Sequence, residues 1–183
     1  AYVEDVTALA RETDASVLVG NSLGGAVVLQ TALESDLALD ALVLAGTGAK
    51  LTVAAPLREL LADDYERAVS VLHEPDRLFH DADPAVVERS KAQLRATGRA
   101  VTERDFLTCH AFDVRDRLGE IAVPALALVG EHDSLTPPES HEFLADHISD
   151  CEYAEIEDAA HLAMAERPAA FNDALDSFVQ GWG

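Results

Sequence analysis

The sequence Val17-Leu-Val-Gly-Asn-Ser-Leu-Gly-Gly25 is typical of an apolar strand that turns sharply into an amphipathic helix. Glycine stands two positions before and two positions after Ser22, where side chains would crowd such a turn. The turn lifts the serine hydroxyl off the sheet and places it at a helix N-terminus, where backbone N–H groups can bind a developing oxyanion. We therefore predict that Ser22 is a nucleophile; the alternative is a serine that only caps the helix. Residues 20–25 are called the elbow below.

An acid and a base follow the elbow, and each stands after an expected strand. Asp133 follows the apolar run Ala125-Leu-Ala-Leu-Val-Gly130, and His161 follows a strand near Glu152–Ile156. A hydroxyl is a poor nucleophile until a base takes its proton, and the base needs an anion that fixes its tautomer. We predict His161 as the base and Asp133 as the orienting acid. Asp158 ranks lower as the acid because it does not follow a strand of its own.

Together these residues resemble the C-terminal part of the α/β-hydrolase superfamily, in which serine, acid and histidine follow in this chain order. The resemblance runs from about Tyr2 to Phe178, and Leu51 to Glu103 contributes little to it. It implies hydrolysis through an acyl-enzyme without a cofactor, and it leaves the substrate open. The stretches similar to its small esterases, enol-lactonases and carbon–carbon bond hydrolases are Gly46-Thr-Gly-Ala-Lys-Leu51, Phe112-Asp-Val-Arg-Asp-Arg-Leu118, Val123-Pro124, Val129-Gly-Glu-His-Asp133 and His161 to Pro168.

The resemblance also implies parts of the fold that come before the first residues of this chain. In the superfamily several strands precede the elbow, and a loop among them supplies the second oxyanion donor. The backbone N–H of Leu23 is then the only oxyanion donor that we assign. We expect the strand Ser16–Val19 to be an open apolar edge, which pairs with a second copy of the chain or a partner chain unless the sequence is a fragment.

Alternating strand and helix patterns predict an α/β fold with a parallel sheet of about four strands, in sequential order, and helices on both faces. The expected strands are Ser16–Val19, Ala41–Ala45, Ala125–Val129 and Glu152–Ile156. The expected helices around them are Tyr2–Glu12, Leu23–Leu33, Pro138–His147 and Pro168–Val179. In the helix after the elbow, the residues expected to face the sheet are Ala26, Val27, Leu29 and Leu33.

The strand pattern stops between Gly48 and Asp116, and helical patterns take its place. The helices expected there are Pro56–Leu72, Pro84–Ala96 and one from Thr102 onward. Thr102 and Asp105 form the expected capping pair of the last helix.

In the superfamily an insertion at this point caps the active site, so the resemblance implies a core of residues 1–47 and 117–183 and a helical cap of residues 48–116. An apolar cap would suit a small acyl or aromatic substrate. The apolar cap residues that are expected in part to line its underside, and otherwise to pack within the cap, are Leu57, Leu60, Leu61, Val69, Leu72, Leu78, Phe79 and Phe106.

Composition limits the remaining possibilities. With 183 residues and 49% hydrophobic composition, the chain can form one domain with a proper core. Its formal net charge of −21 argues against nucleic acid as a partner, because phosphate binding needs clustered cations. Such self-repulsion favours a salt-loving source over an ordinary acidic protein. No apolar run is long enough to cross a membrane and the acidic start is no signal peptide, so we expect a cytoplasmic protein without a membrane partner.

Cysteine and histidine spacing gives little sign of a metal or cofactor. Cys109 and Cys151 are far apart in sequence, and we predict buried thiols. His80-Asp81-Ala-Asp83 has the residue types of a metal site, but the pattern is more typical of a solvated turn before Pro84. His132 is expected to have no separate role, because neighbouring residues at a strand end point apart. We predict no metal and no cofactor.

The leading hypothesis is a serine hydrolase that acts on a small carboxylic ester or lactone through an acyl-enzyme. The first alternative is a carbon–carbon bond hydrolase, which the sequence Gly20-Asn-Ser-Leu-Gly-Gly25 resembles about as well. The second is a non-catalytic or partner-dependent subunit that keeps the elbow and associates through the edge strand.

Overall fold

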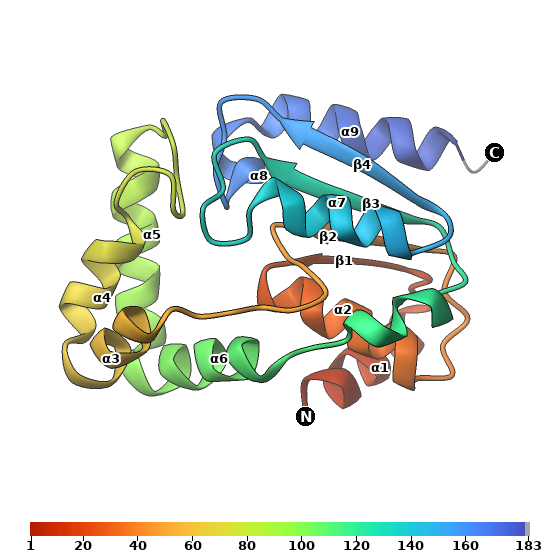
Figure 1. The fold of residues 1–183 in the computed structure, drawn as a ribbon, viewed down its shortest axis with the longest axis horizontal. Helices are drawn as coiled ribbons and strands as arrows, with labels where there is room; N and C mark the ends of the chain where they lie inside the picture. The colour runs from red at the N-terminus through yellow and green to blue at the C-terminus, as the bar shows by residue number, and fades with distance from the viewer. Residues whose placement is uncertain (182–183) are drawn as a thin grey trace.

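One parallel sheet forms the centre of the protein (Figure 1). The computed structural model describes residues 1–181, so residues 182 and 183 of the predicted core lie outside the described residues. The strands are β1 (Val17–Asn21), β2 (Ala41–Ala45), β3 (Ala125–Gly130) and β4 (Cys151–Ile156), and they pair in this order. Every pairing is parallel. The α/β class and the sequential strand order are therefore confirmed.

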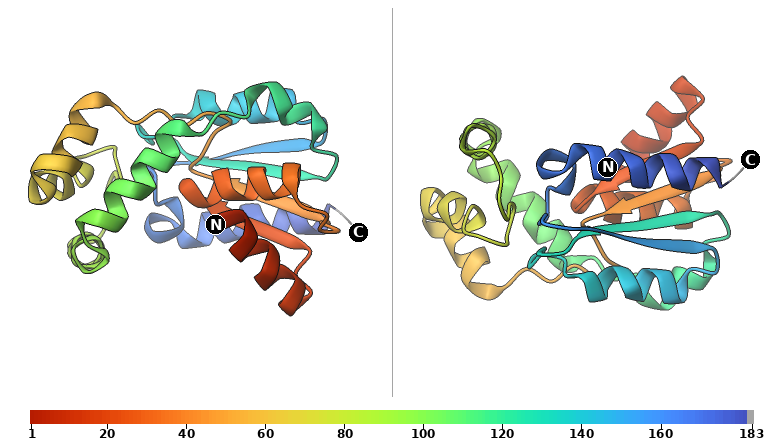
Figure 2. Two further views of the ribbon diagram at one scale, coloured as in Figure 1. Left: turned by 90° about the horizontal axis from the view of Figure 1, so that it is seen from below. Right: turned by 90° about the horizontal axis from the view of Figure 1, so that it is seen from above.

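Helices cover both faces of the sheet, and Figure 2 shows the strands running between α7 and α9. Alternate residues of β2 point to opposite faces, as the strand geometry requires. Leu42 and Leu44 join the core beneath α1, α2 and α7, whereas Val43 joins the core beneath α9. The helices around the sheet are α1 (Tyr2–Thr13), α2 (Leu23–Glu34), α7 (Pro138–His147), α8 (Ala163–Glu166) and α9 (Pro168–Gln180).

The buried face of α2 differs from the expectation by one residue. Val28 is buried and the expected Val27 is only half-buried. The reason lies at Gly25, where a Cβ atom would come within 2.5 Å of the Thr47 side chain. This close approach fixes the inner face of the helix, and Val27 lies about 200° around the axis from Gly25.

A second group of helices lies beyond the carboxyl ends of the strands (Figure 1). The expected single helix 56–72 is two helices, because Asp64 ends the first and its side chain caps the second by accepting a hydrogen bond from the Arg67 N–H. The helices are α3 (Ala55–Asp63), α4 (Tyr65–Leu72), α5 (Pro84–Thr97) and α6 (Arg99–Ala111), with a 3-10 helix η1 (Arg115–Glu120) after them.

The expected capping pair of α6 is wrong. Gly98 is the N-cap of this helix and also ends α5, with a φ of 83° that favours glycine. One residue thus separates the two helices, and Thr102 lies inside α6, where its hydroxyl donates to the Gly98 carbonyl. Asp105 instead accepts a hydrogen bond from the Tyr2 hydroxyl.

The segments that enter and leave this helical group run side by side as a neck. Lys50 and Asp113 form an antiparallel bridge and an ion pair of 3.1 Å between Nζ and Oδ2. The Val114 N–H donates to the Ala49 carbonyl at 2.8 Å. The predicted cap limits, residues 48 and 116, lie just outside the neck, and the division into core and cap stays a prediction.

Within residues 1–181, β1 pairs with one neighbour, β2. Its Val19 side chain is 59% exposed, so this strand is an edge of the sheet as described. Association through this edge stays a prediction. No helix among the described residues is both long enough and apolar enough to span a bilayer.

The two cysteines are half-buried, not fully buried as expected. Cys109 packs on the apolar cluster of α3 and α4, and Cys151 packs on the core beneath α2. Cys109 lies near the end of α6, and Cys151 is the first residue of β4. Burial raises the pKa of both thiols to about 11, so they are protonated at neutral pH.

A substitution at the end of β3 tests the closest approach in this fold. A Cβ atom at Gly130 would clash with the carbonyl oxygens of Ala159 and Ala160, which belong to the loop that carries His161. We expect Gly130→Ala to lower the free energy of unfolding by about 2 kcal/mol or more. Gly119→Ala, where a Cβ atom meets nothing within 4 Å, is the control. Urea unfolding curves measure both, and equal midpoints would contradict this packing.

Candidate active site

The elbow holds Ser22 in an unusual backbone conformation. Its φ of 56° and ψ of −119° lie outside the regions that side chains normally allow. Two hydrogen bonds fix it there: the Ser22 N–H donates to the Ala45 carbonyl at 3.0 Å, and the Thr47 hydroxyl donates to the Ser22 carbonyl at 2.9 Å. The end of β2 therefore holds the turn at the end of β1.

Two glycines make the elbow possible, but one is not the expected one. A Cβ atom at Gly20 would clash with the backbone of Gly24 and Gly25. A Cβ atom at Gly24 itself would meet nothing within 4 Å, whereas one at Gly25 would strike Thr47. The steric requirement after the serine thus falls on the third residue rather than the second, because the helix faces Thr47 at that point.

His161 and Asp133 lie together, as predicted from the sequence. The distance from His161 Nδ1 to Asp133 Oδ2 is 2.8 Å, and the two side chains are 5% and 0% exposed. An ionised carboxylate can only accept hydrogen bonds, so Nδ1 donates and Nε2 is left unprotonated in the neutral ring. Asp158 is exposed and its N–H donates to Glu131.

The Asp133 carboxylate is held by a tight turn. Oδ1 accepts hydrogen bonds from the Leu135 N–H at 2.8 Å and the Thr136 N–H at 2.9 Å, and Oδ2 accepts one from the Thr136 hydroxyl at 2.7 Å. Burial raises the pKa of Asp133, but the hydrogen bonds from His161 and Thr136 outweigh it and lower the pKa below its ordinary value. The carboxyl is therefore ionised at neutral pH. The sequence signal that we missed is Asp-x-x-Thr, a common turn pattern.

Ser22 and His161 line one cavity of about 640 Å³. Its wall is mostly apolar, and it is formed by the elbow, the α3–α6 helices and the loops that follow β3 and β4. Of the eight apolar residues singled out in the sequence, the cavity is lined by Leu57, Leu72, Leu78 and Phe106. The other four are outside the lining and contribute to packing: Leu60, Leu61, Val69 and Phe79.

Leu23 is the first residue of α2, so its N–H has no acceptor within the helix. The cavity is lined by its neighbours Asn21 and Ser22 but not by Leu23. Its role as oxyanion donor stays a prediction.

Asn21, Thr47 and His141 support the site and were missed in the sequence. The Asn21 side-chain amide donates to the His161 carbonyl at 3.3 Å, which ties the elbow to the histidine loop. His141 is fully buried in α7, and its Nε2 accepts the Thr47 N–H at 2.9 Å. These partners are 140 and 94 residues apart, so no local pattern could reveal them.

Residues 76–81, called the return segment, connect α4 with α5 and run beside the two site loops. The Ser134 N–H donates to the Asp76 carbonyl at 2.9 Å, and the His161 N–H donates to the Arg77 carbonyl at 3.2 Å. Within His80-Asp81-Ala-Asp83, Asp83 caps α5, as the expected turn before Pro84 requires. His80 instead bonds Asp76.

Comparison with known proteins identifies the family. The family described as serine aminopeptidase, S33, a hydrolase family, matches residues 1–168. The chain belongs to this family and is an α/β hydrolase. It is similar to a pimeloyl-[acyl-carrier protein] methyl ester esterase of Neisseria meningitidis serogroup C, with 30% identity over 97% of this chain and 74% of the relative. The chain therefore spans about three quarters of the length of that relative.

Solved structures give the same picture for the hydrolase. A thermophilic esterase superposes with a TM-score of 0.88 and 33% identity, over 100% of this chain and 72% of that one. Est816, titled as an N-acyl homoserine lactone degrading enzyme, superposes with a TM-score of 0.83 and 26% identity, over 96% and 73%. The similarity to small esterases that the sequence suggested is confirmed.

The buried His141 gives the hydrolase a specific pH dependence. Burial lowers the pKa of His141 to about 4 from its ordinary 6.5, although its Nδ1 faces the Pro137 carbonyl. The unfolded chain takes up this proton first, so stability is fully present above pH 6.5 and is lost as the pH falls toward 4. Between pH 7.5 and pH 5 we expect a loss of about 2 kcal/mol from this group.

His141→Gln retains an acceptor for the Thr47 N–H but does not titrate. Between pH 7.5 and pH 5 the variant should lose about 2 kcal/mol less stability than the wild type. Urea unfolding curves at the two pH values measure this difference. His147→Gln, at an exposed position on the same helix, should behave like the wild type. A His141→Gln variant with the full wild-type pH dependence would exclude His141 as its source.

Proposed function

We propose that this hydrolase cleaves a small carboxylic ester or lactone through an acyl-enzyme, with Ser22 as nucleophile, His161 as base and Asp133 as orienting acid. One observation carries the proposal. The strained serine of the elbow and His161 share a mostly apolar cavity, and the Nδ1 atom of that histidine donates to a buried, ionised carboxylate. This combination supports acyl transfer by a serine hydroxyl.

The proposed chemistry proceeds in two halves. His161 Nε2 takes the Ser22 hydroxyl proton while Oγ attacks the substrate carbonyl, and the Leu23 N–H donates to the oxyanion that forms. The intermediate collapses, the carbon–oxygen bond to the leaving group breaks, and His161 gives the proton to the departing alkoxide. Water then attacks the acyl carbon with His161 again as base, the bond from that carbon to Ser22 Oγ breaks as His161 returns the proton to Oγ, and the free acid leaves. No cofactor takes part in this sequence.

The cavity supports a small, largely apolar acyl group. A volume of about 640 Å³ lies in the range of small-molecule sites. Its walls carry the apolar side chains of Leu72, Leu94 and Phe106 at the cap side. A methyl ester esterase and a protein titled as lactone-degrading are among the similar proteins, in keeping with this substrate class.

The first experiment tests the nucleophile. The protein is exposed to a fluorophosphonate probe in molar potassium chloride, and the intact mass is measured. We expect one label per chain in the wild type and none in Ser22→Ala, with hydrolysis of p-nitrophenyl butyrate reduced by about 10,000-fold or more. Ser177→Ala, at an exposed position on α9, should label fully. A folded wild type that takes no label would refute the proposal. Cleavage of a vinylogous diketone without ester cleavage would replace it with carbon–carbon bond hydrolysis.

A second experiment tests the acid. Asp133→Asn removes the anion that fixes the Nδ1–H tautomer of His161, so we expect kcat to fall by about 10,000-fold with little change in KM. The matched variant is Asp158→Asn, because Asp158 is the other acid near His161 in sequence and asparagine tolerates its φ of 53°. It should retain wild-type kcat. The reverse result would assign the acid to Asp158.

A further inference from the structure

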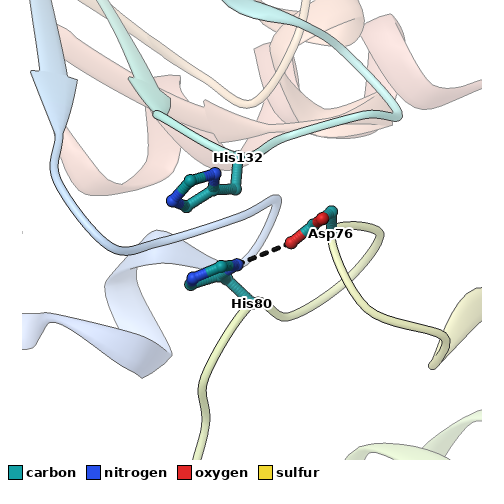
Figure 3. A group of neighbouring side chains, drawn as sticks. All are labelled: Asp76, His80 and His132. Carbon is teal, nitrogen blue, oxygen red and sulfur yellow. Dashed lines mark hydrogen bonds and ion pairs between the residues drawn. The ribbon is translucent and has the colours of Figure 1, made fainter.

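A cluster of nitrogen and oxygen donors lies beside the catalytic loops (Figure 3). His80 and His132 stack with ring centroids 3.7 Å apart, and Asp76 Oδ1 lies 2.6 Å from His80 Nδ1. The donor atoms of these three residues all lie within 4.8 Å of one another. A Glu131 carboxylate oxygen lies 3.6 Å from His132 Nε2, but Glu131 belongs to a neighbouring group with His132 and Asp158. None of these four residues lines the cavity that holds Ser22.

The backbone that carries the cluster is fixed from several sides. A tight turn brings Asp76 beside His80, with the Asp76 N–H donating to the Phe79 carbonyl at 3.0 Å. The His80 N–H donates to the Glu166 carboxylate at 2.8 Å. The His132 N–H donates to the Ala159 carbonyl at 2.8 Å. The donors therefore come from two segments whose relative position is already set, which lowers the entropic cost of binding a ligand between them.

The donor set matches a particular class of ion. Imidazole nitrogens suit zinc, copper, nickel and cobalt, and two imidazoles with one carboxylate form a ligand set that zinc uses. Magnesium and calcium prefer oxygen donors alone. We propose that Asp76, His80 and His132 bind one divalent transition-metal ion outside the catalytic cavity.

Binding requires two local changes. The stacked rings are inclined by only 20°, so their in-plane lone pairs run nearly parallel and one ring must turn to share an ion. The His132 side chain is 33% exposed and has solvent in which to turn, whereas Asp76 holds the His80 ring. The ion replaces the proton between His80 Nδ1 and Asp76 Oδ1, and the ring releases that proton to solvent.

The position of the site gives the ion a structural role. It joins the return segment at His80 to the loop that contains Asp133, one residue beyond His132. An ion bound only by the folded protein stabilises it in proportion to its affinity and concentration. The proposal is independent of ester hydrolysis and would stand if Ser22 proved unreactive.

The test measures metal binding directly. Tag-free protein is stripped with a chelator, freed of it by dialysis, and titrated with Co²⁺ at pH 8 in molar potassium chloride. The salt screens non-specific attraction to this acidic surface. The pH limits competition from protons, because the Asp76 carboxylate raises the pKa of His80. Visible absorption of Co²⁺ reports nitrogen ligation, and calorimetry with Zn²⁺ gives the stoichiometry.

We expect one ion per chain, visible Co²⁺ bands and a higher melting temperature with Zn²⁺. His80→Ala and His132→Ala should each weaken binding by about tenfold or more, and Asp76→Asn should weaken it as well. His147→Ala, at an exposed position on α7, should bind like the wild type. Circular dichroism verifies that each variant is folded.

Two results would overturn the proposal. One is the absence of stoichiometric binding and of Co²⁺ bands in the wild type. The other is loss of binding in His132→Ala but not in His80→Ala, because it would assign the ion to the neighbouring group of Glu131, His132 and Asp158 instead.

Discussion

The strained backbone conformation of Ser22 depends on hydrogen bonds and close packing from the neighbouring residues. A φ of 56° with a ψ of −119° costs a non-glycine residue about 1–3 kcal/mol. Thr47 opposes this cost from the end of β2 by bonding the Ser22 carbonyl and filling the space that Gly25 leaves. His141 in turn accepts the Thr47 N–H from α7. The serine therefore sits where three packed elements meet, and the cavity above it depends on that meeting.

The second constraint is the burial of the Asp133 carboxylate. Taking the Asp133 carboxylate out of water is costly unless its oxygens are fully bonded. Here four hydrogen bonds meet this need: three come from the turn 133–136, and the fourth comes from the His161 ring. In a chain with a net charge of −21, this carboxylate is held ionised by oriented donors and not by a surplus of cations. Burial also acts on His141, because it lowers the pKa of this side chain and so favours the neutral ring.

The return segment lies between two helices of the insertion in sequence, but it is hydrogen-bonded to the loops of the core. Three successive carbonyls of this segment accept backbone N–H groups of Ser134, His161 and Leu162 in the core loops. Glu166 reinforces this by accepting the N–H groups of His80, Asp81 and Ala160. The segment that carries part of the donor cluster is thus built into the site loops, and the helices on either side of it extend from that fixed point.

Local chemistry explains how much of this fold could be predicted. Apolar runs located β1, β2 and β3 to within two residues, because a buried parallel strand needs a continuous apolar stretch. Proline at a first helical turn located α5, α7 and α9. The errors were also local: Asp64 interrupts a helix whose apolar spacing continues through it, and Gly98 caps α6 where Thr102 looked the better candidate.

The strands, the elbow and the three residues of the proposed triad could be identified from local patterns, because each rests on a short stretch that a strand end or a turn requires. The groups that support them come together only when the chain is folded. Asn21 meets His161 across 140 residues and Thr47 meets His141 across 94. His132 stacks on His80 although neither position carries a pattern that predicts it. Such contacts arise when helices and strands pack against one another. Local sequence propensities do not predict which residues will meet across a long separation in the chain.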